Sequence, residues 1–277
     1  MDLEEKERRL EAVLNESASA VVAFSGGVDS SYLAWKAYEI MGDRMMAVTA
    51  ESPSTPAHQR RLTARIIGDY GIPHRVFQSR EIDLDKYRAN DADRCFYCKD
   101  EICSKLCEIA ANAGFAIVMD GLNADDLDDY RPGRKAALKH GVRSPLMEAG
   151  LTKNDIRELS RRAGLPTADE PASACLATRL PYGAEITAEK LQQIDRGEEF
   201  LRETGFRVFR VRHHETLARI ELGHEDLKNA LNPETVARLA AAFKEFGYKY
   251  VTLDLEGYRM GSSNEVLSDL EKQKFNF

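Results

Sequence analysis

The chain has 277 residues, of which 43% are apolar, and this is enough material to bury two separate cores. Acidic residues outnumber basic ones by 46 to 39, and the formal net charge of -7 disfavours non-specific binding to a nucleic acid. No stretch approaches the roughly 20 apolar residues of a membrane span, and the N-terminus lacks the features of a signal peptide. We therefore expect a cytoplasmic protein that binds neither nucleic acid nor membrane. The 5 cysteines are more consistent with thiols, metal ligands or catalysts than with disulfides.

The first half of the chain alternates between helical and strand patterns. An amphipathic helix is expected over 3–14, and the apolar run Ala-Val-Val-Ala-Phe at 20–24 predicts a strand that ends at a tight turn and continues into a helix. Further strands are expected over 45–49, 74–77 and 116–120, and further helices over 56–70, 99–113 and 153–163. This alternation predicts an α/β fold with a doubly wound parallel sheet that helices cover on both faces.

The second half of the chain predicts a smaller α+β domain. Three prolines between residues 164 and 183 disfavour both helix and strand, and we place the domain boundary there, with domains of 1–170 and 171–277. Beyond it, a helix is expected over 187–204 and strands over 207–212, 217–222 and 248–253, with two helical patterns before the last strand.

The loop Ser25-Gly26-Gly27-Val28-Asp29-Ser30 lies between the first expected strand and its helix. Two glycines allow the backbone to approach a phosphate closely, and the N-terminus of the helix attracts an anion. The serines add hydroxyl donors, and Asp29 has a carboxylate suited to a Mg²⁺ ion that bridges phosphate oxygens. The Gly-Lys-Ser/Thr of a Walker P-loop is missing.

This loop resembles the motif of the PP-loop superfamily, whose members hold the pyrophosphate that leaves when ATP adenylates a substrate. The resemblance makes Ser25, Gly26, Gly27, Val28, Asp29 and Ser30 the ATP-binding residues, with Asp29 catalytic. It extends to Asp120-Gly-Leu-Asn-Ala-Asp125-Asp126, in which Asp125 would lie beside the nucleotide. Because ligands bind outside the carboxyl ends of parallel strands, the two segments should face one crevice. Asp128 and Asp129 remain compatible with a plain acidic turn.

Four further segments resemble the LarE family, the PP-loop sulfur transferases of nickel-pincer cofactor biosynthesis for lactate racemase. They are 129–133 (Asp-Tyr-Arg-Pro-Gly), 174–183 (Ala-Cys-Leu-Ala-Thr-Arg-Leu-Pro-Tyr-Gly), 211–214 (Val-Arg-His-His) and 252–259 (Thr-Leu-Asp-Leu-Glu-Gly-Tyr-Arg). The resemblance implies a pyridinium dicarboxylate mononucleotide as substrate, ATP and Mg²⁺ as cofactors, and a homo-oligomer, a hexamer in this family. The sulfide donor is left unknown. Alternatives are NAD synthetase, a tRNA-thiolating enzyme, or a non-catalytic nucleotide or Fe–S binding module.

The cysteines bear on the sulfur source. Cys95-Phe-Tyr-Cys98 has the spacing of a two-ligand clamp, and Cys175 matches the position of the family's sulfur-bearing cysteine. The resemblance implies a [4Fe-4S] cluster on these three residues, with sacrificial transfer of the sulfur of Cys175 as an alternative, and a zinc or redox role for the first two as another. Cys103 and Cys107, four apart on an expected helix, favour a core role.

Candidates for the second half of the site lie beyond the boundary. Arg179 and Arg212 are candidates for the phosphate of the substrate, because a guanidinium fork matches phosphate oxygens, with a structural role as the alternative. Glu199 matches a family position near a possible second metal site, although a solvated glutamate is an alternative. His213 and His214 follow a strand and are left unassigned.

Overall fold

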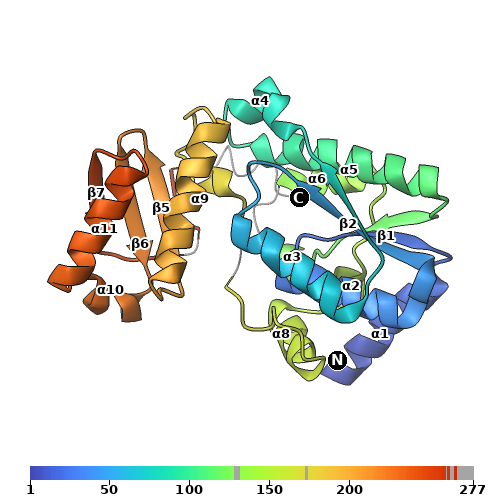
Figure 1. Cartoon of the computed structure of the whole chain (residues 1–277). Coiled ribbons are helices and arrows are strands. Elements are labelled where there is room, and N and C mark those ends of the chain that lie inside the picture. The colour runs from blue at the N-terminus through green and yellow to red at the C-terminus, as the bar shows by residue number, and fades with distance from the viewer. Residues whose placement is uncertain (128–131, 172–173, 260, 263–264, 267–277) are drawn as a thin grey trace.

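The computed structural model describes residues 1–127, 132–171, 174–259, 261–262 and 265–266 (Figure 1). The expected α/β architecture is confirmed, because a parallel four-stranded sheet has the order β3-β2-β1-β4. Its strands are β1 (Ala20–Ala23), β2 (Met45–Glu51), β3 (His74–Gln78) and β4 (Ile117–Met119). Asp128 and Asp129, and residues 129–131 of one family segment, lie outside the described residues.

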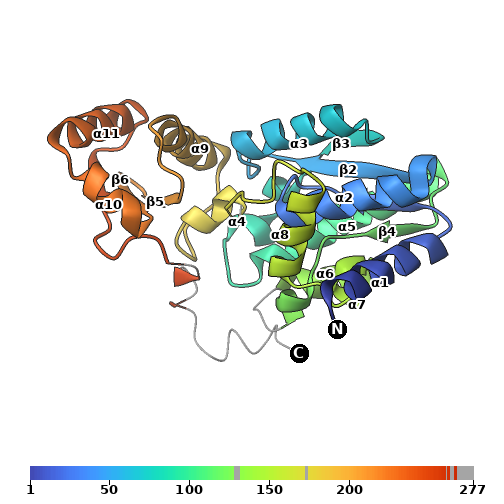
Figure 2. The same ribbon diagram turned by 90° about the horizontal axis from the view of Figure 1, so that it is seen from below.

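Helices cover both faces of this sheet (Figure 2). One face packs on α1 (Leu3–Glu16), α2 (Val28–Met41), α3 (Ala57–Tyr70) and α8 (Lys153–Arg162), and the other on α5 (Arg94–Ala113) and α6 (Pro132–Lys139). The alternation of side chains along a strand explains the two layers, since Val22 joins the first core and its neighbour Val21 joins the second. Both strand residues are fully buried, as expected for a covered parallel sheet.

The strand order places the candidate loop at a reversal point of the sheet. The chain leaves β1 for β2 and β3 on one side and returns to β4 on the other side. The loops after β1 and β4 are therefore neighbours at the carboxyl ends of the strands. A Cβ atom on Gly121, which follows β4, would lie 2.9 Å from the backbone nitrogen of Ser30, so glycine permits this close approach.

A three-stranded sheet with the order β5-β6-β7 forms the second core. It contains β5 (Phe209–His214), β6 (Leu217–Leu222) and β7 (Tyr250–Leu253), and its helices are α9 (Ala188–Glu203), α10 (His224–Ala230) and α11 (Pro233–Glu245). The core is apolar and includes Leu201, Val211, Ile220 and Phe243. Figure 1 shows α9 between this sheet and the larger unit. The domain limits 1–170 and 171–277 stay a prediction.

Several helices depart from the sequence-based expectations. α5 begins at Arg94 instead of Lys99, so both cysteines of the 95–98 pair lie in its first two turns. The short helices α4 (Asp85–Arg88) and α7 (Pro145–Glu148) were not predicted, because four residues are too few to show helical periodicity. Short 3₁₀ turns lie at Gly42–Arg44, Glu81–Asp83, Ala124–Leu127 and Leu176–Arg179. Among the described residues, no helix combines the length and the apolar character needed to cross a bilayer.

Candidate active site

The loop between β1 and α2 is held in shape by its two serines. The hydroxyl of Ser30 accepts the backbone N–H of Ser25 at 3.2 Å, donates to the carbonyl of Gly27 at 3.1 Å and lies 3.1 Å from the hydroxyl of Ser25. Gly26 has a φ of 74°, in the left-handed region that favours glycine. A Cβ atom on Gly26 would stand 2.5 Å from Oγ1 of Thr63 on α3. The loop therefore fits closely against α3.

The helix that follows leaves its N-terminus open for an anion. Gly27 is the N-cap residue of α2 and has no side chain to satisfy the first-turn N–H groups. Gly26, Gly27 and Val28 line a pocket, so these backbone groups border an open space. The positive end of the helix dipole and unpaired donors can hold phosphate oxygens there.

Asp29 is linked to the acidic segment after β4 through Lys153. One carboxylate oxygen of Asp29 is paired with the ammonium of Lys153, and the backbone N–H of Lys153 donates to Asp125 at 2.8 Å. The other oxygen of Asp29 is buried and has no hydrogen-bond partner among the described residues. The structure therefore brings Asp29 and Asp125 to the same residue, Lys153, which links the loop after β1 to the segment after β4.

Asp120 and Asp126 are engaged in structural contacts. Asp120 lies 3.2 Å from the ammonium of Lys99 and accepts the hydroxyl of Ser144 at 2.8 Å. Burial disfavours the charged form of Lys99, but the carboxylate of Asp120 outweighs it and raises the pKa of that lysine. Asp126 accepts the backbone N–H of Asn123 at 3.0 Å and fixes the turn. These two carboxylates therefore hold the segment after β4 in shape.

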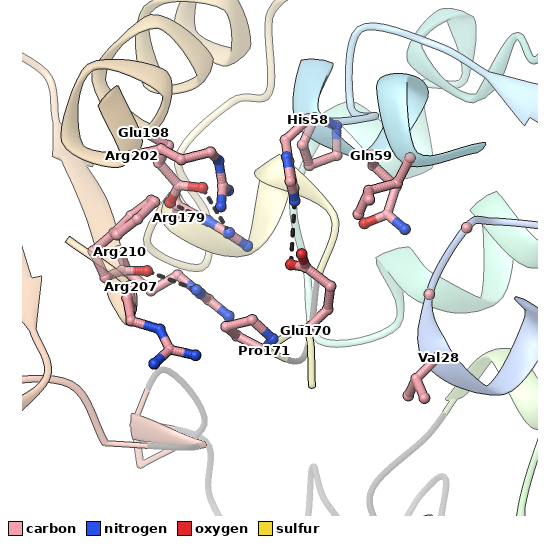
Figure 3. A pocket seen from close by; sticks show the side chains of 15 residues that line it. Val28, His58, Gln59, Glu170, Pro171, Arg179, Glu198, Arg202, Arg207 and Arg210 are labelled. Atoms are coloured by element: carbon pink, nitrogen blue, oxygen red, sulfur yellow. Dashed lines mark hydrogen bonds and ion pairs between the residues drawn. The ribbon is translucent and has the colours of Figure 1, made fainter. Parts of the chain in front are cut away.

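The pocket beside the loop lies between the two cores and has an empty volume of about 540 Å³ (Figure 3). From the larger unit, its lining includes the first turns of α3, where His58 lies 3.2 Å from Glu170 of the connecting segment. From the smaller unit it is lined by several arginines, which are Arg179, Arg202, Arg207 and Arg210. One side of the pocket therefore presents glycines at a helix N-terminus, and the other presents cations.

Arg179 and Arg212 are both buried in ion pairs. Arg179 holds Glu198 with two bonds of 2.8 and 2.9 Å, and it also donates to the carbonyl of Ala174. Burial alone would raise the pKa of Glu198, but the charge of Arg179 lowers it. Arg212 holds Glu221 at 2.9 and 2.8 Å and donates to the carbonyl of Thr178. These contacts favour the structural alternative for both arginines.

Glu199 belongs to a charged contact between α9 and α3. It pairs with Arg61 of α3 and lies 3.5 Å from Arg202. One turn earlier, Asp195 accepts the backbone N–H of Ala57 at 3.1 and 3.2 Å. The N-cap of α3 is Pro56, which has no capping side chain, so α9 caps this helix across the two units. The contacts of Glu199 favour an interface role over a metal site.

The three cysteines of the sulfur hypothesis lie in one region. Cys95 and Cys175 are exposed, and Cys98 is half-buried. Burial raises the pKa of Cys98 well above its usual range, and the neighbouring charge of Cys175 and then that of Cys95 contribute. Within the described ranges, however, no three side chains among His, Cys, Asp and Glu are arranged to hold a metal ion. The thiols are close but do not converge on one point.

Asn90 ties the two cysteine-bearing segments together. It has a φ of 58°, which asparagine tolerates better than most residues, and it separates α4 from α5. Its amide donates to the carbonyls of Pro181 and Ala184 at 2.7 and 3.0 Å, and its carbonyl accepts from Arg94. The start of α5 is thereby fixed against the segment that follows Cys175.

The remaining candidates have ordinary surroundings. Cys103 is fully buried in the core behind the sheet, which confirms its expected core role, and burial raises its pKa to about 11. Cys107 is half-buried, with its thiol 3.7 Å from the carbonyl of His140. His213 is buried and lies 3.1 Å from the hydroxyl of Tyr248, whereas His214 is exposed. Burial lowers the pKa of His213. Partial desolvation and the neighbouring charges of Arg219 and Arg212 lower the pKa of His214.

Comparison with known proteins decides the family. The pyridinium-3,5-bisthiocarboxylic acid mononucleotide synthase of Lactiplantibacillus plantarum is 34% identical over 271 residues, which cover 98% of each chain. The chain belongs to the LarE family. An uncharacterized Synechocystis protein is 42% identical over 266 residues, 96% of this chain and 99% of that one. An uncharacterized Methanocaldococcus jannaschii protein is 29% identical over 246 residues, 86% and 90% of the two chains. No protein-family model matches the chain.

Several residues near the site of this LarE-family chain were not among those that the sequence predicted. The sequence placed Lys153 at the start of a helix and gave it no role. Because a cation is disfavoured at a helix N-terminus, this position was a signal that the lysine has a specific partner. Arg207 and Arg210 line the pocket, but arginines are common on strands and loops and no local pattern marks them. Tyr87, whose hydroxyl lies 3.7 Å from the sulfur of Cys175, sits in a short helix that the sequence did not reveal.

Proposed function

We propose that this LarE-family chain binds ATP at the Ser25–Ser30 loop, adenylates a carboxylate of a pyridinium-3,5-dicarboxylate mononucleotide, and then replaces the AMP with sulfur. The observation that carries the proposal is the loop itself, whose Gly26, Gly27 and Val28 line the pocket and whose Asp29 is paired with Lys153. The other oxygen of Asp29 is buried and has no hydrogen-bond partner among the described residues. The name of the Lactiplantibacillus plantarum relative supports the choice of substrate. The PP-loop fold and the ATP dependence are part of the proposal.

Asp29 is the residue that we propose to hold Mg²⁺. Its buried oxygen without a hydrogen-bond partner is a suitable ligand, since Mg²⁺ prefers carboxylate oxygens and phosphates together. Asp125 contacts the backbone N–H of the same residue, Lys153, and would be a second carboxylate near the ion. The ion, when bound, would neutralise charge on the phosphates. We propose that Lys153 does the same for an oxygen of the leaving pyrophosphate.

The adenylation step is a nucleophilic substitution at the α-phosphorus of ATP. A carboxylate oxygen of the substrate forms the new P–O bond, and the bond to the β-phosphate breaks, so that pyrophosphate leaves with the electron pair. The N–H groups of the loop and the N-terminus of α2 would stabilise the negative charge that develops on the phosphates. The resulting acyl adenylate is activated, because AMP is a far better leaving group than oxide. Sulfur then attacks the carbonyl carbon, and AMP leaves.

Cys175 is the residue that we propose to carry the sulfur chemistry. It is exposed, and the connecting segment that precedes it lines the pocket at Glu170 and Pro171. We propose that Cys95, Cys98 and Cys175 hold a [4Fe-4S] cluster, because thiolates are the ligands of such clusters and the charges of the other two thiols act on Cys98. The described side chains are not arranged around one point, so binding of the cluster would require the three thiols to turn toward each other. A cluster on three thiolates would leave one iron open for an extra sulfide. The alternative remains that Cys175 gives up its own sulfur.

The arginine side of the pocket is suited to the phosphate of the substrate. Arg207 is exposed and lines the pocket, and Arg210 lies beside it with its guanidinium over the ring of Tyr258. The sequence proposed Arg179 and Arg212 for this role. Both are buried in ion pairs, with Glu198 and Glu221 respectively. Glu198 also accepts the backbone N–H of Val211 on β5 at 3.2 Å, next to Arg210. We propose that Arg207 and Arg210 provide the direct contacts.

Anaerobic purification with iron and sulfide analysis tests the sulfur source. Wild type is compared with Cys95→Ala, Cys98→Ala and Cys175→Ala, and Cys107→Ala is the matched control on the same helix α5. The cluster predicts bound iron in wild type and in the control, and its loss in the other three variants. Iron-free wild type with full activity, together with loss of H₂S from Cys175 after one turnover, would establish the sacrificial route instead. Release of pyrophosphate by Asp29→Asn would contradict the assignment of the loop.

A further inference from the structure

The backbone of Cys175 is held in place by contacts on its C-terminal side. Its carbonyl oxygen accepts the hydroxyl of Thr178 at 2.9 Å and a guanidinium N–H of Arg179 at 3.2 Å. The next residue, Leu176, donates its backbone N–H to the carbonyl of Ser54 at 3.0 Å. Ser54 lies in the loop that follows β2, so the larger unit supports the cysteine directly. The position of the Cys175 backbone is therefore fixed although its side chain is exposed.

The sulfur of Cys175 lies near the hydroxyl of a buried tyrosine, Tyr87. Tyr87 is 1% exposed and packs in the second core with Leu176 and Leu180. Its hydroxyl lies 2.6 Å from Oγ of Ser54 and 3.7 Å from Sγ of Cys175. A buried hydroxyl without a partner is costly, so these two contacts account for the presence of a phenol at an otherwise apolar position.

The direction of the hydrogen bonds follows from a count of donors. The hydroxyls of Ser54 and Tyr87 have one hydrogen each. Among the described residues, Tyr87 is the partner recorded for the hydroxyl of Ser54. If Ser54 donates to Tyr87, the hydrogen of the phenol is left for the sulfur, and both hydroxyl hydrogens are used. In the reverse arrangement Tyr87 donates to Ser54, and the hydrogen of the buried Ser54 hydroxyl is left without an acceptor.

We propose that Tyr87 is a positioning residue whose hydroxyl, oriented by Ser54, donates a hydrogen bond to the sulfur on Cys175. The role of this sulfur rests on the proposed function. The donor fixes the direction of the sulfur and lowers its electron density, whichever of the two sulfur routes operates. Sulfur transfer needs the fixed direction, because the sulfur must face the adenylate. It also needs the lowered electron density, because the sulfur must not react with other electrophiles beforehand.

Alkylation of the reduced, metal-free protein by iodoacetamide tests this hydrogen bond. The rates at Cys175 and Cys95 are measured by peptide mass spectrometry in the same sample, at a pH of about 10, above the ordinary thiol pKa of about 8.5. An ordinary hydrogen bond changes basicity about fivefold. Nucleophilicity follows basicity with an exponent of about 0.4–0.5, so Tyr87→Phe should raise the rate at Cys175 about twofold. The exposed Cys95 is the internal control and should react at an unchanged rate.

Unchanged alkylation of Cys175 in Tyr87→Phe, or an equal change at Cys95, would overturn the proposal. Ser54→Ala removes the first hydroxyl of the Ser54–Tyr87–Cys175 hydrogen-bond series and leaves the aromatic ring of Tyr87 in place. It should raise the rate at Cys175 by less than Tyr87→Phe, because the phenol keeps its hydrogen but loses its orientation. If Tyr87→Phe does not fold, the result for Ser54→Ala decides, and an unchanged rate there overturns the proposal. The assay contains neither ATP nor substrate, so a failure of the proposed function would not affect it.

Discussion

Replacement of Gly26 by alanine tests the geometry of the nucleotide loop in energetic terms. The φ of Gly26 is 74°, and an L-residue in the left-handed region costs roughly 1–2 kcal/mol. The new Cβ atom would also stand 2.5 Å from Oγ1 of Thr63 and 3.3 Å from the backbone carbonyl of Gln59. Overpacking of this kind costs about 1–3 kcal/mol. We therefore expect Gly26→Ala to destabilise the larger unit by about 2–5 kcal/mol.

Gly27→Ala is the matched control. The φ of Gly27 is -76°, and the nearest atom to its new Cβ is Oγ of Ser25 at 3.6 Å, which is ordinary contact. Its free energy of unfolding should change by less than about 1 kcal/mol. The single tryptophan of the chain, Trp35 on α2, reports the transition by fluorescence in a urea titration. Thr63→Ala in the Gly26→Ala background should recover the steric part of the loss. Equal stability of the two glycine variants would refute this reasoning.

Three further predictions concern the pocket and the second core. Lys153→Met removes the ion pair with Asp29 and the proposed contact with a phosphate of ATP. Because a charge-assisted contact is worth about 1.5–3 kcal/mol, calorimetry should show ATP affinity reduced about ten- to hundredfold. Unchanged affinity would exclude a contact between Lys153 and a phosphate. Asp195→Ala removes the cap of α3 and should cost about 1 kcal/mol in a denaturant titration, whereas Glu203→Ala on the exposed side of α9 should not. Burial lowers the pKa of His213 below the ordinary histidine pKa of about 6.5. The contribution of neutral His213 to the free energy of unfolding is therefore complete above about pH 6.5. As the pH falls below about 6.5, this contribution is lost by up to about 1.4 kcal/mol per pH unit. His213→Gln should show a flatter pH dependence of stability over the same range, and equal slopes would contradict this assignment.

The larger sheet was predictable from the sequence because its signals are local. The run Ala20–Ala23 is apolar and short, the Gly26-Gly27 turn follows at once, and α2 begins at Val28 with a regular helical pattern. The proximity of Asp29 and Asp125 was also predictable, because parallel strands bring their carboxyl ends to the same edge. These inferences need only strand order and motif position.

The contacts that shape the site were not predictable in the same way. The sequence makes Arg179 a plausible phosphate ligand, but its guanidinium is paired with Glu198, which is 19 residues away and indistinguishable from the neighbouring Glu199 in sequence. Tyr87 reaches Cys175 over 88 positions from a helix of only 4 residues. Such pairs depend on how two cores pack together, and periodicity and motif spacing contain no information on that packing.

A complete turnover assay distinguishes carboxylate adenylation from other uses of ATP. The purified protein is incubated anaerobically with ATP, Mg²⁺, sulfide and pyridinium-3,5-dicarboxylate mononucleotide, and the products are analysed by mass spectrometry. The proposed function predicts AMP and pyrophosphate in equal amounts, and a product in which sulfur replaces a carboxylate oxygen. Pyrophosphate release and the sulfur-containing product should both be absent with Asp29→Asn. Cys175→Ala should still release pyrophosphate but yield no sulfur-containing product. Formation of ADP, or release of AMP without any requirement for the carboxylate, would contradict it.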